Sequence, residues 1–255
     1  MTRPPSTRLE RRRRAQASKG PPRDLQTLAA AVPAAAASIG GAEADRAARA
    51  VAAEIGAANA AGRGFAEVAR DLAGGVSAFR TGTIAHEAAE VPAGLDCRAG
   101  CAFCCILAGE DGALISQAEA QAVHAALQPV AGLPDGRAFH AAACPALDPE
   151  TLTCRVYDAR PIICRAYIST DAEACRAAVE GEIRPGPGVL SAYPLYLAIL
   201  DLARALFGVP NVPTYSLARL AAAAVEGKPL EAALAQAKHR PTVLRGERRR
   251  IDGGR

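Results

Sequence analysis

Apolar residues recur with a helical period in the first part of the chain, from about Asp24 to Glu90. Asp24 is placed to cap a first helix that Pro33 limits, and the pair Gly40 and Gly41 separates this helix from the next. Further helices are predicted over 44–60 and 64–79, the second with an apolar stripe of Phe65, Val68, Leu72, Val76 and Phe79.

A second helical region begins after proline and glycine interrupt the pattern at 185–188, and it runs to about Lys238. Its first helix is apolar over a wide arc, so we expect it to be buried. Two neighbouring stripes make up this arc, one of Leu195, Ile199, Leu202 and Leu206, the other of Tyr196, Leu200, Ala203 and Phe207. Pro210 and Pro213 end it, and two more helices are predicted over 216–225 and 229–238.

The middle of the chain, residues 91–185, is rich in turn residues and predicts little regular structure. A helix is expected over 116–127, because Ser116 and Glu119 form a capping box at its start. Weak strand signals lie at 152–157, as a short strand or hairpin, and at 162–163, after Pro161.

Composition supports a mainly α fold: an irregular cysteine-rich segment with at most a short hairpin, flanked by helices. Of 255 residues 62 are alanine, and there is no tryptophan. Alanine is the best helix former, so the core should be thin and helical, and a sandwich or barrel rich in β-branched residues is not expected.

Charge divides the chain into three parts: a basic tail over 1–23, an acidic body over 24–237 and a basic tail over 238–255. We expect the body to be a single helical domain and both tails to be disordered, because blocks of like charge repel. The arginine run at 11–14 has no interleaved aromatic residues for base stacking, so nucleic-acid binding is not expected.

The sequence predicts no membrane span. In the most apolar stretch, 189–212, charged residues, prolines and a glycine interrupt the run of apolar residues that a span needs. The stretch 28–37 is a poor signal-peptide core, because it is mostly alanine and contains Pro33. We therefore expect a cytoplasmic protein, with export as the alternative.

All the cysteines fall within residues 91–185, and the first four of them read C-x3-C-x2-C-C. On a helix Cys97, Cys101 and Cys104 would share a face, whereas the adjacent Cys104 and Cys105 cannot easily serve one centre together. One of that pair is expected to serve a second centre or the core. The candidate metal ligands are Cys97, Cys101, Cys104, Cys105, Cys144, Cys154, Cys164 and Cys175.

Three interpretations of these thiols are open: buried structural cysteines, a disulfide framework, and metal ligation. Clustering disfavours the first, and the second is typical of small secreted domains. Thiolates select zinc, iron–sulfur clusters or copper(I), and the sequence alone does not decide between a zinc site and one or two cubane clusters. His140, four residues before Cys144, is a further candidate ligand, although a surface position is the simpler interpretation.

The downstream cysteines stand in a longer motif, C-P-x-L followed by C-x-x-Y-x-x-R-P-x-x-C-R, over residues 144–165. Together with the upstream C-x3-C-x2-C-C, it resembles the YkgJ-like cysteine-cluster family, a zinc- or iron-chelating CxxCxxCC domain. One extra residue between Cys97 and Cys101 departs from the nominal motif. The resemblance implies a metal ion as the partner and zinc or iron, including iron–sulfur, as the cofactor. Some relatives look like metal-dependent protein methylases, so a metal-dependent modifying enzyme is the alternative function, and enzymatic activity stays undecided.

The neighbours of the thiols suggest how an anionic metal–thiolate centre would be neutralised. Five arginines stand close to a cysteine in the sequence, namely Arg98, Arg155, Arg160, Arg165 and Arg176. Arg160 has an ion pair with Asp158 as its alternative role. Tyr157 either donates a hydrogen bond to sulfur or packs in the core.

Overall fold

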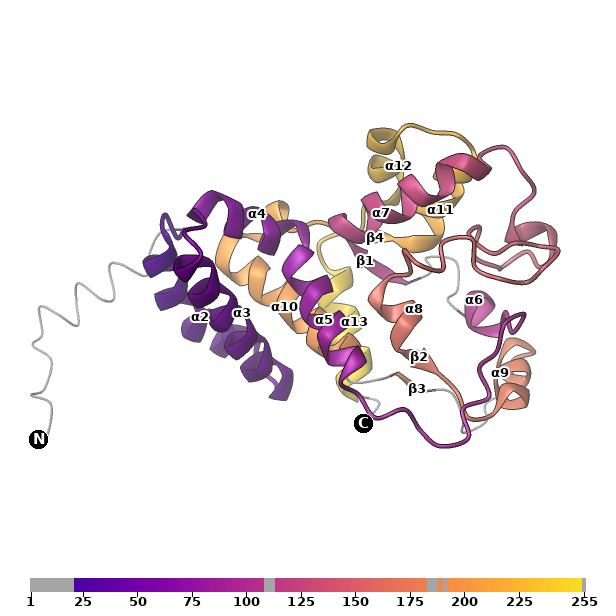
Figure 1. The fold of residues 1–255 in the computed structure, drawn as a ribbon, viewed down its shortest axis with the longest axis horizontal. Coiled ribbons are helices and arrows are strands. Elements are labelled where there is room, and N and C mark those ends of the chain that lie inside the picture. The colour runs from indigo at the N-terminus through magenta and orange to yellow at the C-terminus, as the bar shows by residue number, and fades with distance from the viewer. Residues whose placement is uncertain (1–20, 108–112, 183–187, 190–191, 254–255) are drawn as a thin grey trace, which may run out of the picture.

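The computed structural model describes residues 21–107, 113–182, 188–189 and 192–253 (Figure 1), and the mainly α fold is confirmed. Most described residues lie in helices, connected by turns and loops. The α-helices in these residues are α2 (Leu25–Ile39), α3 (Ala42–Ala60), α4 (Phe65–Gly74), α5 (Val76–Glu87), α6 (Phe103–Leu107), α7 (Gln117–Leu127), α8 (Ile162–Ala166), α9 (Ala172–Val179), α10 (Ala192–Phe207), α11 (Leu217–Val225), α12 (Leu230–Ala237) and α13 (Val243–Gly253). Short 3-10 turns are η1 (Gln128–Val130), η2 (Gly136–Ala138) and η3 (Val209–Asn211).

Two short antiparallel pairs of strands join segments that are distant in the sequence. Strand β1 (Leu114–Ser116) pairs with β4 (Thr214–Ser216), and β2 (Tyr167–Ile168) pairs with β3 (Gly188–Val189). The strand expected over 152–157 is reduced to a single bridge between Leu147 and Cys154.

The strand expected at 162–163 is wrong, because these residues begin helix α8. Pro161 caps this helix with a φ of −58°, and a proline is tolerated where a helix needs no N–H donor. The first free N–H of the helix, that of Ile162, donates to the carboxylate of Glu119 at 2.9 Å. Glu119, which is distant in the sequence, therefore stabilises the start of α8 and favours a helix over a strand at 162–163.

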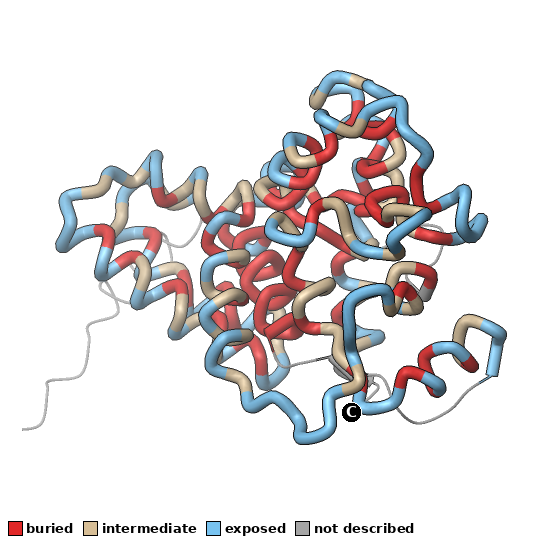
Figure 2. Tube along the Cα trace, turned by 45° about the vertical axis from the view of Figure 1, so that its right-hand side comes forward, coloured by how far each residue is buried: buried red, intermediate tan, exposed pale blue. Residues whose placement is uncertain are grey.

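Helix α10 is the centre of the molecule, as its apolar pattern predicts. Helices α2, α3, α5 and α13 pack around it, and nearly every residue of α10 is buried. Figure 2 shows the buried residues gathered along these central helices. Helices α7, α11 and α12 form a second packed group around Val123, Leu127 and Leu220 (Figure 1).

The single helix expected over 64–79 is in fact two, α4 and α5, which meet at Gly75. Gly75 has a left-handed φ of +85°, and a Cβ there would lie 2.3 Å from the Cβ of Ser116. The break lets the chain turn while it packs closely against the start of α7. Val76, expected on the apolar stripe, is partly exposed as a result.

Gly75→Ala is expected to lower the free energy of unfolding by about 2 kcal/mol or more, because positive φ and a steric clash act together. Gly62→Ala is the matched control, since Gly62 has a similar φ of +70° and a Cβ added to it would meet nothing within 4 Å. Urea denaturation of both variants separates the two contributions. Equal losses in the two variants would show that the contact with Ser116 carries no cost.

Pro33 does not end the first helix, contrary to the sequence prediction, and α2 continues to Ile39. The proline lies on the exposed side of the helix, whereas Leu28 and Val32 are buried on the other side. The predicted cap is confirmed, since the Asp24 carboxylate accepts from the N–H of Thr27 at 2.7 Å.

The C-terminal tail, expected to be disordered over 238–255, forms helix α13 from residue 243 to 253. Leu244 is fully buried, and the Arg248 guanidinium donates to the buried Asp201 carboxylate at 2.6 Å. Two of the arginines in this segment, Arg248 and Arg250, are paired with carboxylates, so like charges do not prevent the helix from forming, and the charge argument failed. The N-terminal tail lies outside the described residues as far as residue 20.

In the part of the chain that the structure describes, no helix is both long enough and apolar enough to cross a membrane.

Candidate metal centre

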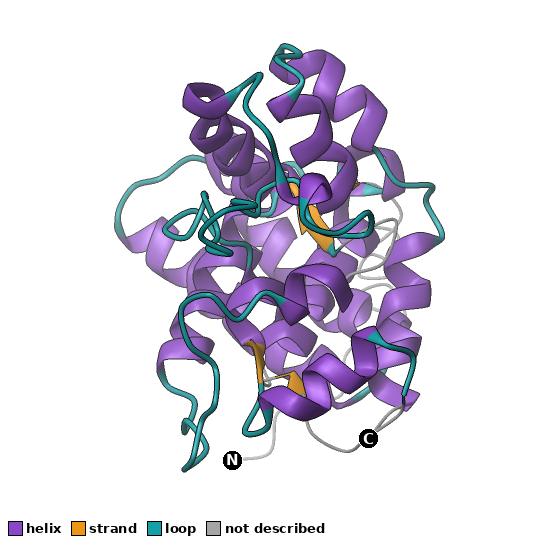
Figure 3. Cartoon of the chain, turned by 90° about the vertical axis from the view of Figure 1, so that its right-hand side faces the viewer, coloured by secondary structure: helices purple, strands orange, loops and turns teal. Residues whose placement is uncertain are grey.

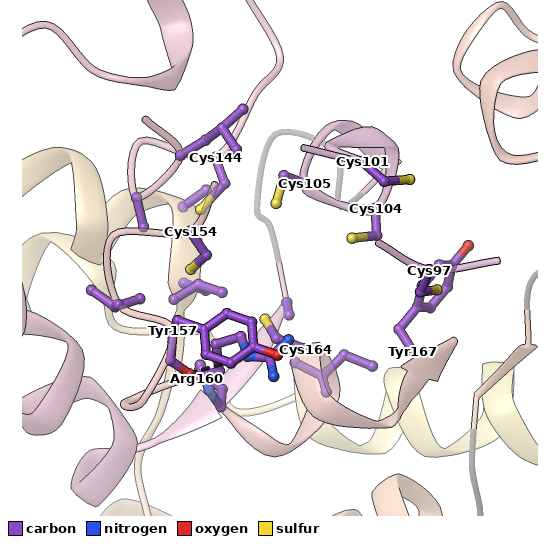
Figure 4. A pocket seen from close by; sticks show the side chains of 18 of the residues that line it. Cys97, Cys101, Cys104, Cys105, Cys144, Cys154, Tyr157, Arg160, Cys164 and Tyr167 are labelled. Atoms are coloured by element: carbon purple, nitrogen blue, oxygen red, sulfur yellow. Dashed lines mark hydrogen bonds between the residues drawn. The ribbon is translucent and has the colours of Figure 1, made fainter. Parts of the chain in front are cut away.

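All eight cysteines line a single cavity of about 870 Å³ (Figure 4). They come from the loop before α6, from α6 itself, from the loop between η2 and α8, and from α8 and α9. All eight are free thiols in the structure, so the disulfide framework considered from the sequence is not formed. Figure 3 shows this side of the molecule face-on, with long loops between the helices.

Backbone hydrogen bonds hold the loop of Cys144 and Cys154 against α6. The N–H of Cys144 donates to the carbonyl of Cys105 at 3.0 Å, which brings these two cysteines together. Within the loop, Cys154 bridges to Leu147. Gly136 in η2 allows this turn to pack closely against the backbone of Cys144, because a Cβ at Gly136 would lie 2.3 Å from the Cys144 carbonyl oxygen.

A second set of contacts fixes Cys97 near the start of α9. The N–H of Ser169 donates to the Sγ of Cys97 at 3.3 Å, and the N–H of Asp96 donates to the Ser169 carbonyl at 3.0 Å. The Asp96 carboxylate accepts from the N–H of Ala172 at 2.9 Å. These bonds tie the first thiol of the motif to the helix that carries Cys175.

Burial disfavours the thiolate form of the cysteines deepest in the cavity wall. It raises the pKa of Cys144 to about 12 and the pKa of Cys164 well above its ordinary value. Cys104 behaves oppositely: a hydrogen bond from the Cys105 thiol, aided by the charge of Arg160, lowers its pKa to about 7. The environment of Cys104 therefore favours its thiolate form, whereas the environments of Cys144 and Cys164 favour the protonated thiol.

Two of the five arginines proposed to neutralise the centre line the cavity, Arg98 and Arg160. Arg160 stacks on the ring of Tyr157, 3.7 Å from its centroid, and donates to the Tyr157 carbonyl rather than pairing with Asp158. Tyr157 is 60% exposed at the cavity wall, so the core position considered for it is wrong.

The remaining three arginines have other partners. Arg155 pairs with Asp148 at 3.1 Å, and Arg176 pairs with Glu173 at 2.7 Å. Arg165 donates to two backbone carbonyls, those of Arg160 and Asp158.

His140 is exposed and does not line the cavity, so the surface interpretation is confirmed. Four titratable residues that line the cavity were not singled out from the sequence: Tyr167, His239, Glu247 and Arg250. Tyr167 could have been predicted from the sequence, because it lies close to Cys164 along the chain. The other three come from the C-terminal segment, whose packing no local pattern indicates.

The donors that face the cavity suit a thiophilic metal, because thiolates bind zinc, iron–sulfur clusters and copper(I) in preference to hard cations. Their spacing is wider than a coordination sphere: among the described residues, no group of three or more His, Cys, Asp or Glu side chains is arranged to hold a metal ion. The chemistry of the donor set therefore fits a metal, and binding requires the thiols to move closer together.

Comparison with known proteins agrees with the donor chemistry. Residues 96–180 match the family model CxxCxxCC, described as "Putative zinc- or iron-chelating domain". No curated protein and no solved structure matches the chain. The match covers about a third of the chain and lies over the cysteine-rich segment, whose motifs indicate the same family.

Proposed function

We propose that this protein binds zinc or iron, the latter as an ion or an iron–sulfur cluster, through the eight cysteine thiolates. The observation that carries the proposal is their convergence: thiols from two loops and from helices α6, α8 and α9 all face one cavity. The ligands would be Cys97, Cys101, Cys104, Cys105, Cys144, Cys154, Cys164 and Cys175.

Their burial favours ligation over a structural role. A structural cysteine behaves as a small apolar side chain and is usually buried in the core. Only Cys175 is buried in this sense among the eight, whereas the others are half-buried or exposed at the cavity wall. Thiols that line a cavity instead of filling the core are available to a ligand.

The charges around the cavity support the same function. Four thiolates around Zn²⁺ leave a doubly negative centre, which needs nearby cations and N–H donors. Arg98, Arg160 and Arg250 line the cavity, and the N–H of Ser169 already donates to the sulfur of Cys97.

Purification without oxygen, followed by elemental analysis, tests the proposal. We expect zinc or iron to stay with the wild-type protein, and we expect less of the metal to stay with Cys164→Ser. Thr153→Ala is the matched control, because Thr153 also lines the cavity but offers no thiolate. A folded, metal-free wild-type protein, or equal metal loss in both variants, would refute it.

A metal-dependent modifying enzyme remains the second candidate, and the size of the cavity favours it. A volume of about 870 Å³ lies in the range of small-molecule sites and exceeds what one metal ion fills. An organic cosubstrate would lie beside the thiols, near Tyr157 and Arg160. Calorimetric screening of the metal-loaded protein against methyl-donor cofactors tests this candidate, and the absence of any binding would count against it.

A further inference from the structure

We infer that the cavity holds two separate metal centres, one formed by Cys105, Cys144, Cys154 and Cys164, the other by Cys97, Cys101, Cys104 and Cys175. This inference rests on the proposed metal binding and adds how the ligands are divided. The first set is the loop set, named after the loop that carries Cys144 and Cys154, and the second is the α9 set, named after the helix that carries Cys175.

The loop set is held together by the backbone and by one apolar cluster. Cys105 and Cys144 are joined by the hydrogen bond between the Cys144 N–H and the Cys105 carbonyl, at 3.0 Å. Cys144, Cys154 and Cys164 all pack against the cluster around Val156 and its neighbours in α7 and α11. Figure 4 shows the Cys105 sulfur on the side of Cys144 and Cys154.

The α9 set is assembled by the packing of α6 on α9. This contact brings Cys104 on α6, with Cys101 just before that helix, toward Cys175 on α9. Cys97 joins them through its bond from Ser169, which lies two residues before the Asp171 cap of α9.

Tyr167 lies beside the α9 set, and Figure 4 shows it next to Cys97. Burial first, and then repulsion from Cys175, Cys104 and Cys97, raise the pKa of Tyr167 to about 12. The pKa of Cys101 is likewise raised by burial and then by Cys104, Cys97 and Cys175, the three other members of its set. These neighbours agree with the division drawn from packing.

The adjacent pair on α6 explains why there are two sets. Neighbouring residues on a helix point about 100° apart, so Cys104 and Cys105 cannot both reach one ion without strain. In Figure 4, Cys105 turns toward the loop set, and Cys104 lies between it and Cys97. Cys104 also repels all four thiols of the loop set, so it stands at the boundary between the sets and not apart from the first.

Each set has the ligand number that a thiolate centre requires. A structural zinc site takes four ligands, and a cubane cluster also takes four cysteines. Two such centres use every thiol in the chain, and they also account for a cavity that is too large for one ion.

The test uses the full chain, reduced and metal-free, titrated with Zn²⁺ under anaerobic conditions and then alkylated for mass spectrometry. We expect about two equivalents of zinc and protection of all the thiols from alkylation. Cys175→Ser should keep about one equivalent and protect only the loop set, whereas Cys164→Ser should keep about one and protect only the α9 set.

Top-down mass spectrometry of the one-zinc form of the wild-type protein provides a reading that needs no variant. Its protected thiols should belong to one set in each molecule. Protection that mixes the sets, or loss of all protection in either variant, would overturn the division while leaving metal binding intact. A wild-type protein that takes up no zinc or iron would instead overturn the proposed function.

Discussion

Replacing Glu119 with alanine is expected to lower the free energy of unfolding by about 3 kcal/mol or more, because the buried N–H and hydroxyl donors around its carboxylate lose their acceptor. The carboxylate is almost fully buried and accepts from the N–H of Ser116 at 2.8 Å and from the N–H of Ile162 at 2.9 Å. The hydroxyl of Tyr196 on α10 donates to it as well. Glu119 therefore joins the start of α7, the start of α8 and the central helix.

Chemical denaturation monitored by circular dichroism measures this effect, with Glu173→Ala as the matched control. Glu173 is also a helical glutamate, but it is exposed and pairs only with the surface Arg176, so its loss should cost less than about 1 kcal/mol. Glu119→Gln should fall between the two, because its amide keeps only one acceptor for the two backbone donors. Equal stability of Glu119→Ala and Glu173→Ala would contradict the role given to Glu119.

The same carboxyl makes stability depend on pH. Burial, the dominant cause, raises the pKa of Glu119 above its ordinary 4.5, despite opposing hydrogen bonds. A raised pKa in the folded state means that its contribution to stability is fully present below the unfolded pKa and is lost as pH rises through the folded pKa. As the pH rises from the unfolded pKa to the folded pKa of Glu119, the wild type should therefore lose stability relative to Glu119→Gln. Below and above this interval the difference in stability should stay constant.

Removing the metal is expected to open the cysteine-rich segment over 91–185 and leave the helical bundle closed. The apolar cluster under α6 is small, consisting of Ala102, Ile106, Ala143 and Leu147 with a few partly buried neighbours. The cluster around α10 is far larger. Structural metal sites in small modules supply about 10 kcal/mol or more of binding energy that is coupled to folding.

Hydrogen exchange before and after chelation measures this opening segment by segment. Amides in α6 and α9 should exchange faster by orders of magnitude, whereas those of α3 and α10 should change little. Restoring Zn²⁺ should restore protection, which controls for damage by the chelator. Unchanged exchange in α6 and α9 would show that the metal does not contribute to folding.

Local patterns predicted the elements that local interactions determine. Helix α10 follows from its wide apolar arc, and α7 from the capping box of Ser116 and Glu119, which the structure contains. The break at Gly75 and the pairing of β1 with β4 did not follow, because each depends on a partner far along the chain.

In the candidate site, too, the residues set by local patterns were predicted, and the residues that depend on distant partners were missed. The cysteine spacing indicated the metal chemistry, and the thiols do face one cavity. Glu247 and Arg250 were missed because they reach the cavity only through α13, which is held by the buried pair of Arg248 and Asp201. Charge counted along the sequence cannot reveal an ion pair between residues 47 positions apart.

X-ray absorption at the edge of the bound metal, measured on protein purified without oxygen, tests thiolate ligation most directly. For zinc we predict a first shell of sulfur alone at about 2.3 Å, and for iron a shell dominated by sulfur. A zinc shell of nitrogen or oxygen at about 2.0–2.1 Å, without sulfur, would contradict the assignment of the eight cysteines as ligands.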